Sequence, residues 1–293
     1  MPLDAWRQTK NTLHLFCQIV GKIRLRLHPR LNHWWHVTLY VSPRGLTTRK
    51  IPYGGGNFEI EFDFRDHKLK MTSSNGSYEE FALYNGLSVA DFYSSVFANL
   101  AKIGVGCEIL ALPYEAPSET PFAEDHSNCA YDKEYVEKYH RVLVTVDDIL
   151  EEFRGRFIGK STPVHMFWHS FDLALTRFSG KRVPTREGAG IVEREAYSHE
   201  VISFGFWFGD DKVEAPAFYS YTAPEPAGLA DEPLTPDSAK WADSNGAHLA
   251  LLMYDDVREL ADPKTAVLDF LESSYQAGAK LAKWPIDEFN ADQ

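Results

Sequence analysis

The chain has 293 residues, of which 44% are hydrophobic and 14% aromatic, and its formal net charge is −12 at pH 7. This length predicts about two domains or one large one, and the composition can fill a hydrophobic core. The acidic balance argues against non-specific binding to nucleic acid or to an anionic membrane surface, because each phosphate contact needs a lysine or an arginine.

The sequence also indicates where the protein works. No stretch approaches the ~20 consecutive apolar residues of a membrane-spanning helix, and no basic and apolar leader follows Met1. The cysteines Cys17, Cys107 and Cys129 are too few and too scattered for a disulfide framework or a thiolate metal cage. We therefore expect a cytoplasmic protein whose partner is a small-molecule substrate or ligand. The sequence indicates no oligomeric state.

The first half of the chain is expected to form a helix, several antiparallel strands and a second helix. Residues 3–20 can form the first helix. Basic residues from Lys22 to Arg30 then alternate with apolar ones, a period of two that predicts a strand over 22–31 with one basic face. Further strands are expected at 34–42, 57–64, 67–72 and 78–83.

The second half repeats this order after a connector. Residues 113–131 are rich in proline, serine and acidic side chains and show no apolar period, so we place the two halves at 1–112 and 132–293. Apolar residues from Tyr135 to Phe157 at helical spacing predict a long amphipathic helix. Strands are expected at 163–168, 171–178, 200–208, 216–222 and 248–254.

Two helix starts are marked by capping residues. Ser88 is followed three residues later by Asp91, the spacing of a capping box. Asp262 and Pro263 supply an N-cap and a first-turn proline for the last helix. Both helices should therefore begin at these positions.

The fold class predicted from this layout is α+β, with two halves of the order helix, antiparallel sheet, helix. Residues 19–22 resemble 157–160, each ending in a Gly-Lys step, and 58–62 resemble 199–204. We interpret the common order as an internal duplication about a pseudo-twofold axis, while noting that such layouts also recur by chance. A cleft between the two copies is then the expected binding site.

Several long motifs resemble those of an uncharacterised bacterial domain-of-unknown-function family, over nearly the whole chain. The motifs are Asn32-His33-Trp34-Trp35-His36, Gly45-Leu46-Thr47-Thr48, Ser161-Thr162-Pro163-Val164-His165-Met166-Phe167-Trp168, Phe171-Asp172-Leu173-Ala174 and Arg194-Glu195-Ala196-Tyr197-Ser198-His199-Glu200-Val201. The resemblance implies no activity and no catalytic residue. The family pattern usually has a small residue where this chain has His169, which makes His165 the better candidate of the two.

Acid–base chemistry is the first hypothesis for function. Glu195, Tyr197 and His199 would share one face if this segment were extended, presenting an acid, a phenol and an imidazole to one cavity. Antiparallel pairing of neighbouring strands could add His165 to the same site. We therefore predict His165, His199 and Glu195 as catalytic residues of a small-molecule enzyme, with a solvated loop as the alternative for this segment.

A divalent metal site is the second hypothesis. His165 and His169 are four residues apart, but in a strand this spacing separates them by ~13 Å, so they cannot share a metal ion. Ligands would have to come from separate segments, and the predicted set is His165, His199 and Glu200, since imidazole and carboxylate suit a divalent ion. No dinucleotide fingerprint or phosphate loop is present, so no nucleotide cofactor is predicted.

The remaining predictions concern binding and an isolated acid. Asp172, within an apolar strand, is expected to face water or to pair with a cation such as Arg177, because a buried lone carboxylate is costly. A non-catalytic ligand-binding protein is the third hypothesis for function. Residues expected to contact the substrate are His33, Trp35, Lys160, Trp168 and Tyr197.

Overall fold

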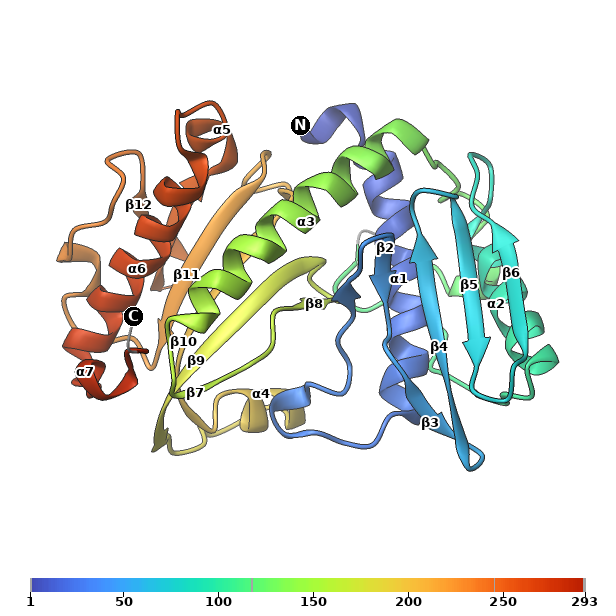
Figure 1. Cartoon of the computed structure of the whole chain (residues 1–293), viewed down its shortest axis with the longest axis horizontal. Coiled ribbons are helices and arrows are strands. Elements are labelled where there is room, and N and C mark those ends of the chain that lie inside the picture. The colour runs from blue at the N-terminus through green and yellow to red at the C-terminus, as the bar shows by residue number, and fades with distance from the viewer. Residues whose placement is uncertain (1, 117, 245, 292–293) are drawn as a thin grey trace. The chain divides into compact units, whose positions relative to one another are not determined.

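Two antiparallel sheets, each accompanied by long helices, make up the computed structural model (Figure 1), which describes all residues except 1, 117, 245, 292 and 293. The fold is therefore α+β, as predicted. The chain forms two compact units that do not follow the chain order strictly. We call residues 4–145 and 165–171 the N-terminal unit, and residues 1–3, 146–164 and 172–293 the C-terminal unit.

The N-terminal unit contains a meander of short strands. One long helix precedes these strands in the chain and another follows them. The strand order is β1-β2-β4-β5-β6, with β3 paired to β4. The predicted connector 113–131 lies within this unit. Its elements are α1 (Arg7–Leu27), β1 (Tyr40–Val41), β2 (Gly45–Thr47), β3 (Ile51–Tyr53), β4 (Gly56–Asp63), β5 (Lys68–Ser73), β6 (Tyr78–Ala82), α2 (Val89–Lys102) and β8 (His165–Phe167), with short 3-10 helices at Leu3–Ala5, Asn32–Trp34 and Phe122–Glu124.

The predicted basic strand over 22–31 is wrong, because α1 continues to Leu27. Every residue from Thr12 to Arg24 is buried, so this part of the helix has no solvent-facing side that could produce a helical period. Lysine, arginine and leucine are also good helix formers. The six alternating residues 22–27, of which the first three are buried, therefore imitate the pattern of a strand.

Other local predictions for this unit are confirmed. Strands β4, β5 and β6 match the expected positions, and Ser88 caps α2 by accepting a hydrogen bond from the Asp91 backbone nitrogen at 3.1 Å. The expected strand over 34–42 is reduced to β1. A short 3-10 helix covers Asn32–Trp34 instead, with φ of +54° at His33 and +62° at Trp34.

The C-terminal unit contains the second sheet and the last helices. The strands follow the order β12-β13-β11-β10-β9-β7. Helix α3 (Lys133–Gly155) starts in the N-terminal unit and ends in this one. The other elements are β7 (Lys160–Ser161), β9 (Asp172–Arg182), α4 (Ile191–Ala196), β10 (His199–Trp207), β11 (Ala217–Ala223), β12 (Lys240–Ser244), β13 (Ala247–Met253), α5 (Tyr254–Val257), α6 (Pro263–Leu281) and α7 (Ile286–Phe289), with a 3-10 helix at Leu229–Asp231.

One face of this second sheet packs on helices. Helix α6 passes so close that a Cβ on Gly278 would lie 2.1 Å from the Thr222 side chain, and Phe153 of α3 packs edge-on against Phe204 at 4.9 Å between ring centres. Asp262 caps α6 as predicted, accepting from the Thr265 backbone nitrogen at 3.0 Å. Strands β9, β10, β11 and β13 and helix α3 also agree with the sequence expectation, which missed β12 and α4.

The predicted residue correspondence between the halves does not hold at the Gly-Lys steps. Lys22 lies inside helix α1, whereas Lys160 begins strand β7. These are different topological places, although the order helix, antiparallel sheet, helix does recur along the chain. The internal duplication is therefore not confirmed.

Candidate functional site

The second face of the C-terminal sheet carries polar and aromatic side chains. Residues paired across an antiparallel sheet share a face, and the register aligns Ser203 with both Thr176 and Tyr221, and Gly205 with Tyr219. We call this surface the tyrosine face. It consists of Asp172, Ala174 and Thr176 on β9, Ser203, Gly205 and Trp207 on β10, and Tyr219 and Tyr221 on β11.

Tyr219 reaches across the central strand to Asp172. Its hydroxyl donates a hydrogen bond to the Asp172 carboxylate at 2.5 Å, spanning from β11 to β9. Gly205 lies beneath the ring, and a Cβ at that position would come within 2.4 Å of the Tyr219 ring and 2.2 Å of the Leu173 carbonyl oxygen. A glycine is therefore required here by a close approach of side chain to backbone.

Asp172 does not pair with Arg177, the cation that the sequence made a candidate. Five positions separate the two on one strand, so their side chains point to opposite faces. Arg177 is 1% exposed and lies among aromatic rings, with its Cζ 3.7 Å from the Phe153 ring centre. Its guanidinium donates to the Phe153 carbonyl oxygen at 2.6 Å, and burial lowers its pKa to about 10.

Hydroxyl groups continue along the tyrosine face. The Thr176 and Ser203 hydroxyls are 2.9 Å apart, and the Tyr197 and Tyr221 hydroxyls are 3.3 Å apart. The rings of Tyr219 and Tyr221 are nearly parallel, at an interplanar angle of 10°, with centres 6.3 Å apart. The face therefore combines flat aromatic surface with a row of groups that can both donate and accept hydrogen bonds.

The electrostatics of this face keep its phenols neutral. Burial, together with the negative charge of Asp172, raises the pKa of Tyr219 well above its usual value. Burial and the neighbouring Tyr197 do the same to the pKa of Tyr221. Near neutral pH both phenols are therefore hydrogen-bond donors and cannot act as bases. Asp172, which is 9% exposed, is the acid among the residues of the tyrosine face.

A second notable cluster lies in the N-terminal unit and is basic. Arg24 of α1 is 3% exposed and Arg49, in the loop after β2, is exposed. Their Cζ atoms lie 5.5 and 3.6 Å from the centre of the Tyr40 ring. Within the described part of the chain, neither guanidinium has a carboxylate partner within ion-pair distance. We call Arg24 and Arg49 the arginine pair.

Burial lowers the pKa of Arg24, the Tyr40 phenol raises it, and the charge of Arg49 lowers it further. Arg24 lies near the C-terminal end of α1, where the helix dipole favours a cation by only ~0.3–1 kcal/mol. Taking an ion out of water costs several kcal/mol. The dipole alone therefore does not account for a buried guanidinium at this place.

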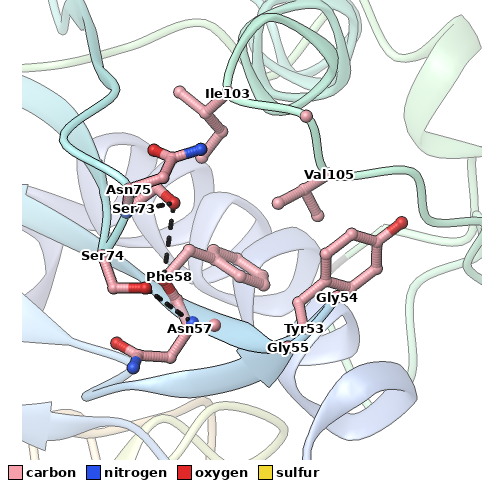
Figure 2. A pocket seen from close by; sticks show the side chains of 12 residues that line it. Tyr53, Gly54, Gly55, Asn57, Phe58, Ser73, Ser74, Asn75, Ile103 and Val105 are labelled. Carbon is pink, nitrogen blue, oxygen red and sulfur yellow. Dashed lines mark hydrogen bonds between the residues drawn. The ribbon is translucent and has the colours of Figure 1, made fainter.

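Figure 2 shows an open pocket of the N-terminal unit, between the β3–β4 hairpin, the β5–β6 turn and the end of α2. Its volume is about 410 Å³, and Tyr53 and Ser74 line opposite sides of it. The Tyr53 hydroxyl is occupied by the backbone of Gly106, to which it donates at 3.2 Å and from which it accepts at 2.9 Å. Among the described lining residues no carboxylate, imidazole, thiol or cation occurs, so this pocket has no acid–base pair.

A larger pocket of about 720 Å³ in the same unit is lined by residues 4–9, 85 and 130–134. Two of its polar pairs bond to each other: Arg7 pairs with Asp4 at 3.0 Å, and the Thr9 hydroxyl accepts from the Asp132 backbone nitrogen.

The predicted catalytic residues belong to different units. His165 lies in β8 of the N-terminal unit, 1% exposed, with its ring edge-on to Phe167 at 4.5 Å. His199 opens β10 of the C-terminal unit, and its Nδ1 is 3.0 Å from the Ser198 hydroxyl. Glu195 lies in helix α4. The predicted alternation of Glu195, Tyr197 and His199 on one strand face is therefore wrong, while a joint site with His165 stays a prediction.

Glu200, the predicted metal ligand, is engaged by its neighbours on the sheet. Its carboxylate accepts from the Ser179 hydroxyl at 2.8 Å and pairs with Lys181 at 3.7 Å. Among the residues that the structure describes, no group of three or more His, Cys, Asp or Glu side chains is placed to hold a metal ion. The metal site with His165 and His199 remains a prediction.

The predicted substrate contacts are also divided between the units. His33, Trp35 and Trp168 lie in the N-terminal unit, and Lys160 and Tyr197 in the C-terminal one. The rings of His33 and Trp35 are 5.6 Å apart. Lys160 is exposed at the start of β7. Tyr197 is 41% exposed, and its hydroxyl is 3.3 Å from that of Tyr221 on the tyrosine face.

Trp168 is held in place by the backbone. Its ring nitrogen donates to the Val37 carbonyl oxygen at 2.8 Å, and the Lys22 ammonium lies 5.5 Å from its ring centre. A Cβ on Gly21 would come within 2.1 Å of the ring, so α1 and the tryptophan touch at a glycine. This residue is 5% exposed and thus part of the packing of its unit.

Sequence reasoning missed Asp172, Tyr219 and Tyr221 as a site. A usable signal was present, because polar or small residues alternate with apolar ones along β9, β10 and β11 at the strand period. The arginine pair had no such signal. Arg24 and Arg49 are 25 positions apart, and only the folding of the chain brings both to Tyr40.

Comparison with known proteins adds one match. A family model described as a family of unknown function (DUF5996) covers residues 1–291. No curated protein and no solved structure matches the chain. Within the described part of the chain, none of the helices combines the length and the apolar character needed to cross a lipid bilayer.

Proposed function

Because the chain belongs to the DUF5996 family, for which no function is known, we propose from geometry that it binds a neutral, ring-bearing small molecule with hydroxyl groups on the tyrosine face. The observation that carries this proposal is the pose of Tyr219, whose ring crosses Gly205 and whose hydroxyl ends on Asp172. This arrangement forms a flat aromatic surface with hydrogen-bonding groups along its edge.

The chemistry of the face favours one class of ligand. Parallel phenol rings offer an apolar surface to the face of a saturated or aromatic ring, and the hydroxyls of Tyr221, Ser203 and Thr176 can donate to and accept from ligand hydroxyls. The Asp172 carboxylate accepts hydrogen bonds from ligand donors and repels an anion. A neutral polyhydroxylated ring therefore suits this surface better than a phosphate or a carboxylic acid.

The helices of the C-terminal unit support the same assignment. The contacts that α6 and the end of α3 make with this sheet involve Thr222, Ile202 and Phe204, whose side chains point away from the tyrosine face. The tyrosine face is thus a polar surface backed by a packed core. Rigid sheet positions of this kind hold binding groups more accurately than loops do.

Ligand-observed NMR with glucose, galactose and myo-inositol on the full chain tests the binding proposal. We expect saturation transfer to at least one of these probes, and a loss of about tenfold or more in affinity in Tyr219→Phe and Asp172→Asn. The matched control is Tyr78→Phe, which removes a phenol hydroxyl bonded to a carboxylate, Glu80, on the other sheet. Equal affinity in all four proteins, or no binding to any probe, would refute the proposal.

A reaction at this face would use the acid–base residues that the sequence indicated. Tyr197 lies between Glu195 and His199 in the chain and bonds to Tyr221, which supports His199 as a base acting on a ligand of the tyrosine face. Following a bound probe by NMR over hours tests this step. Conversion by the wild type, with binding but no conversion by His199→Ala, supports a His/Glu enzyme. Binding without conversion by the wild type supports a non-catalytic binding protein.

A further inference from the structure

We propose that the arginine pair of the N-terminal unit is a second, independent binding site, which takes an oxyanion group such as a phosphate or a carboxylate. Two guanidinium groups lie against one phenol ring, at 5.5 Å for Arg24 and 3.6 Å for Arg49. This site shares no residue with the tyrosine face and does not depend on its function.

The first argument is the unused bonding capacity of Arg24. One terminal nitrogen of its guanidinium donates to the Thr48 carbonyl oxygen. Its Nε is buried and has no hydrogen-bond partner among the described residues. A buried donor without a partner is uncommon in folded proteins. The Nε of Arg177 shares this state but lies among aromatic rings, whereas Arg24 has a second cation, Arg49, against the same Tyr40 ring. Carboxylate and phosphate oxygens are the acceptors that match the planar fork of arginine.

The second argument is the lack of charge compensation. Other cations in the same unit have carboxylate partners, as Arg44 and Lys70 do in Asp63. The positive charges of Arg24 and Arg49 instead repel each other. Within the described residues no acidic side chain lies within ion-pair distance of either. An anion held between them would relieve this repulsion and supply the acceptor for Nε.

The third argument is the backbone at Arg49. Its φ is +51°, in the left-handed region that non-glycine residues rarely adopt. The Thr47 hydroxyl stabilises this conformation by accepting from the Arg49 backbone nitrogen at 2.8 Å. The strained loop places the guanidinium on the Tyr40 ring, and strain kept by its surroundings is a feature of ligand-binding positions.

The alternative is that Arg24 has a structural role alone and anchors the loop through its hydrogen bond to Thr48. Anchoring explains one of its hydrogen bonds. It explains neither the orphan Nε nor the second arginine in a strained conformation on the same ring. Since Arg49 is exposed, it gives an anion a solvent-side approach to the site.

Isothermal titration calorimetry on the full chain tests the site, with sodium phosphate in one arm and sodium acetate in the other, each at constant ionic strength set with sodium chloride. We expect saturable binding of at least one anion, tighter than about 10 mM. Phosphate alone would identify a phosphoryl ligand, acetate alone a carboxylate, and both a general oxyanion site. No saturation in either arm would overturn the proposal.

Two substitutions separate this site from general electrostatics. Arg49→Gln should weaken binding about tenfold or more, and because the side chain is exposed the protein should fold normally. Arg26→Gln is the matched control, since it removes an exposed arginine two positions beyond Arg24 on the same helix. Equal weakening by both variants, or wild-type affinity in Arg49→Gln, would show that the pair is not a site. The anion affinity of Arg24→Gln gives a third comparison, provided that this variant folds.

Discussion

The two sheets of this protein use their second faces in opposite ways. On the N-terminal sheet, the face away from the aromatic core carries Glu59, Glu61, Asp63, Lys68, Lys70 and Glu80, which we call the charged face. Asp63 pairs with Arg44 and Lys70, and Lys68 pairs with Glu80. On the C-terminal sheet, the equivalent surface holds one carboxylate, hydroxyl groups and phenol rings.

This difference concerns how far the polar groups of each face are used by one another. On the charged face the acids Glu59 and Glu61 are also bonded, to the hydroxyls of Thr47 and Ser42. A surface whose charges are all used internally contributes solubility and local order. The tyrosine face keeps neutral groups with spare lone pairs and flat rings, which is the composition of binding surfaces rather than of solvated ones. Four predictions test this contrast, and a fifth concerns the arginine pair.

The largest expected effect is on the charged face. Asp63 has a fully buried carboxylate that accepts from Lys70 at 2.6 Å and from the backbone nitrogens of Arg65 and Asp66 at 3.0 and 2.9 Å, besides its bond from Arg44. Asp63→Ala should lower the free energy of unfolding by about 3 kcal/mol at pH 7, because Arg44 and Lys70 then keep only the exposed Asp66 as a partner and two backbone N–H groups lose their acceptor. Urea denaturation measures this, and a loss below about 1 kcal/mol would contradict the internal-pairing account.

Asp63 also predicts a pH dependence. Burial would raise its pKa, but the donors Arg44 and Lys70 outweigh this and hold the pKa below its ordinary range. A lowered pKa contributes stability above the unfolded value of about 4, and this contribution is lost as the pH falls below that value. Wild type should therefore lose more stability between pH 5 and pH 2 (roughly the acid range of carboxylates) than Asp63→Ala does.

The second effect concerns the glycine beneath Tyr219. Gly205→Ala places a Cβ against the Leu173 carbonyl oxygen and the Tyr219 ring, so the ring must move off Asp172. We expect a loss of about 2 kcal/mol in stability, typical of overpacking, together with loss of any ligand of the tyrosine face. The control is Gly155→Ala, since a Cβ at Gly155 meets no neighbouring atom within 4 Å. Equal stability of the two variants would contradict the close approach of Gly205 to the Tyr219 ring and the Leu173 carbonyl oxygen.

A smaller effect is expected from the Tyr219 hydroxyl itself. Tyr219→Phe keeps the ring over Gly205 and removes the donor to Asp172. One hydrogen bond is lost, so the stability loss should be about 1 kcal/mol, while ligand affinity falls more. A much larger loss of stability, with affinity unchanged, would assign the pair to folding alone.

The smallest effect has the opposite sign. Arg49→Gly removes the strain of the left-handed backbone at this position and the charge repulsion with Arg24, and both changes stabilise the folded protein. The greater flexibility that glycine gives to the unfolded chain offsets part of this gain in stability. The net gain should be about 0.5 kcal/mol in the absence of an oxyanion. Arg49→Ala removes the charge but keeps the strain, so comparing the two melting temperatures separates the contributions. A glycine variant less stable than the alanine variant would remove the strain argument.

Local patterns in the sequence predicted much of the fold. The caps Ser88 and Asp262, helix α3 and strands β4 to β6 and β9 to β11 follow from periodicity and side-chain chemistry within a few residues. These features depend on neighbours in the chain, so the sequence alone contains their cause. Helix α1 beyond residue 21 could not be predicted in this way, because basic and apolar residues alternate over 22–27 with the period of a strand.

The candidate sites depended on tertiary structure. The tyrosine face requires the register of three strands, which brings Tyr219, Gly205 and Asp172 into line. The arginine pair requires α1 and the loop after β2 to meet at Tyr40. Single-sequence patterns indicate which residues share a strand face, because that period is local. They do not indicate which distant side chains meet, because contact is decided by the packing of whole elements.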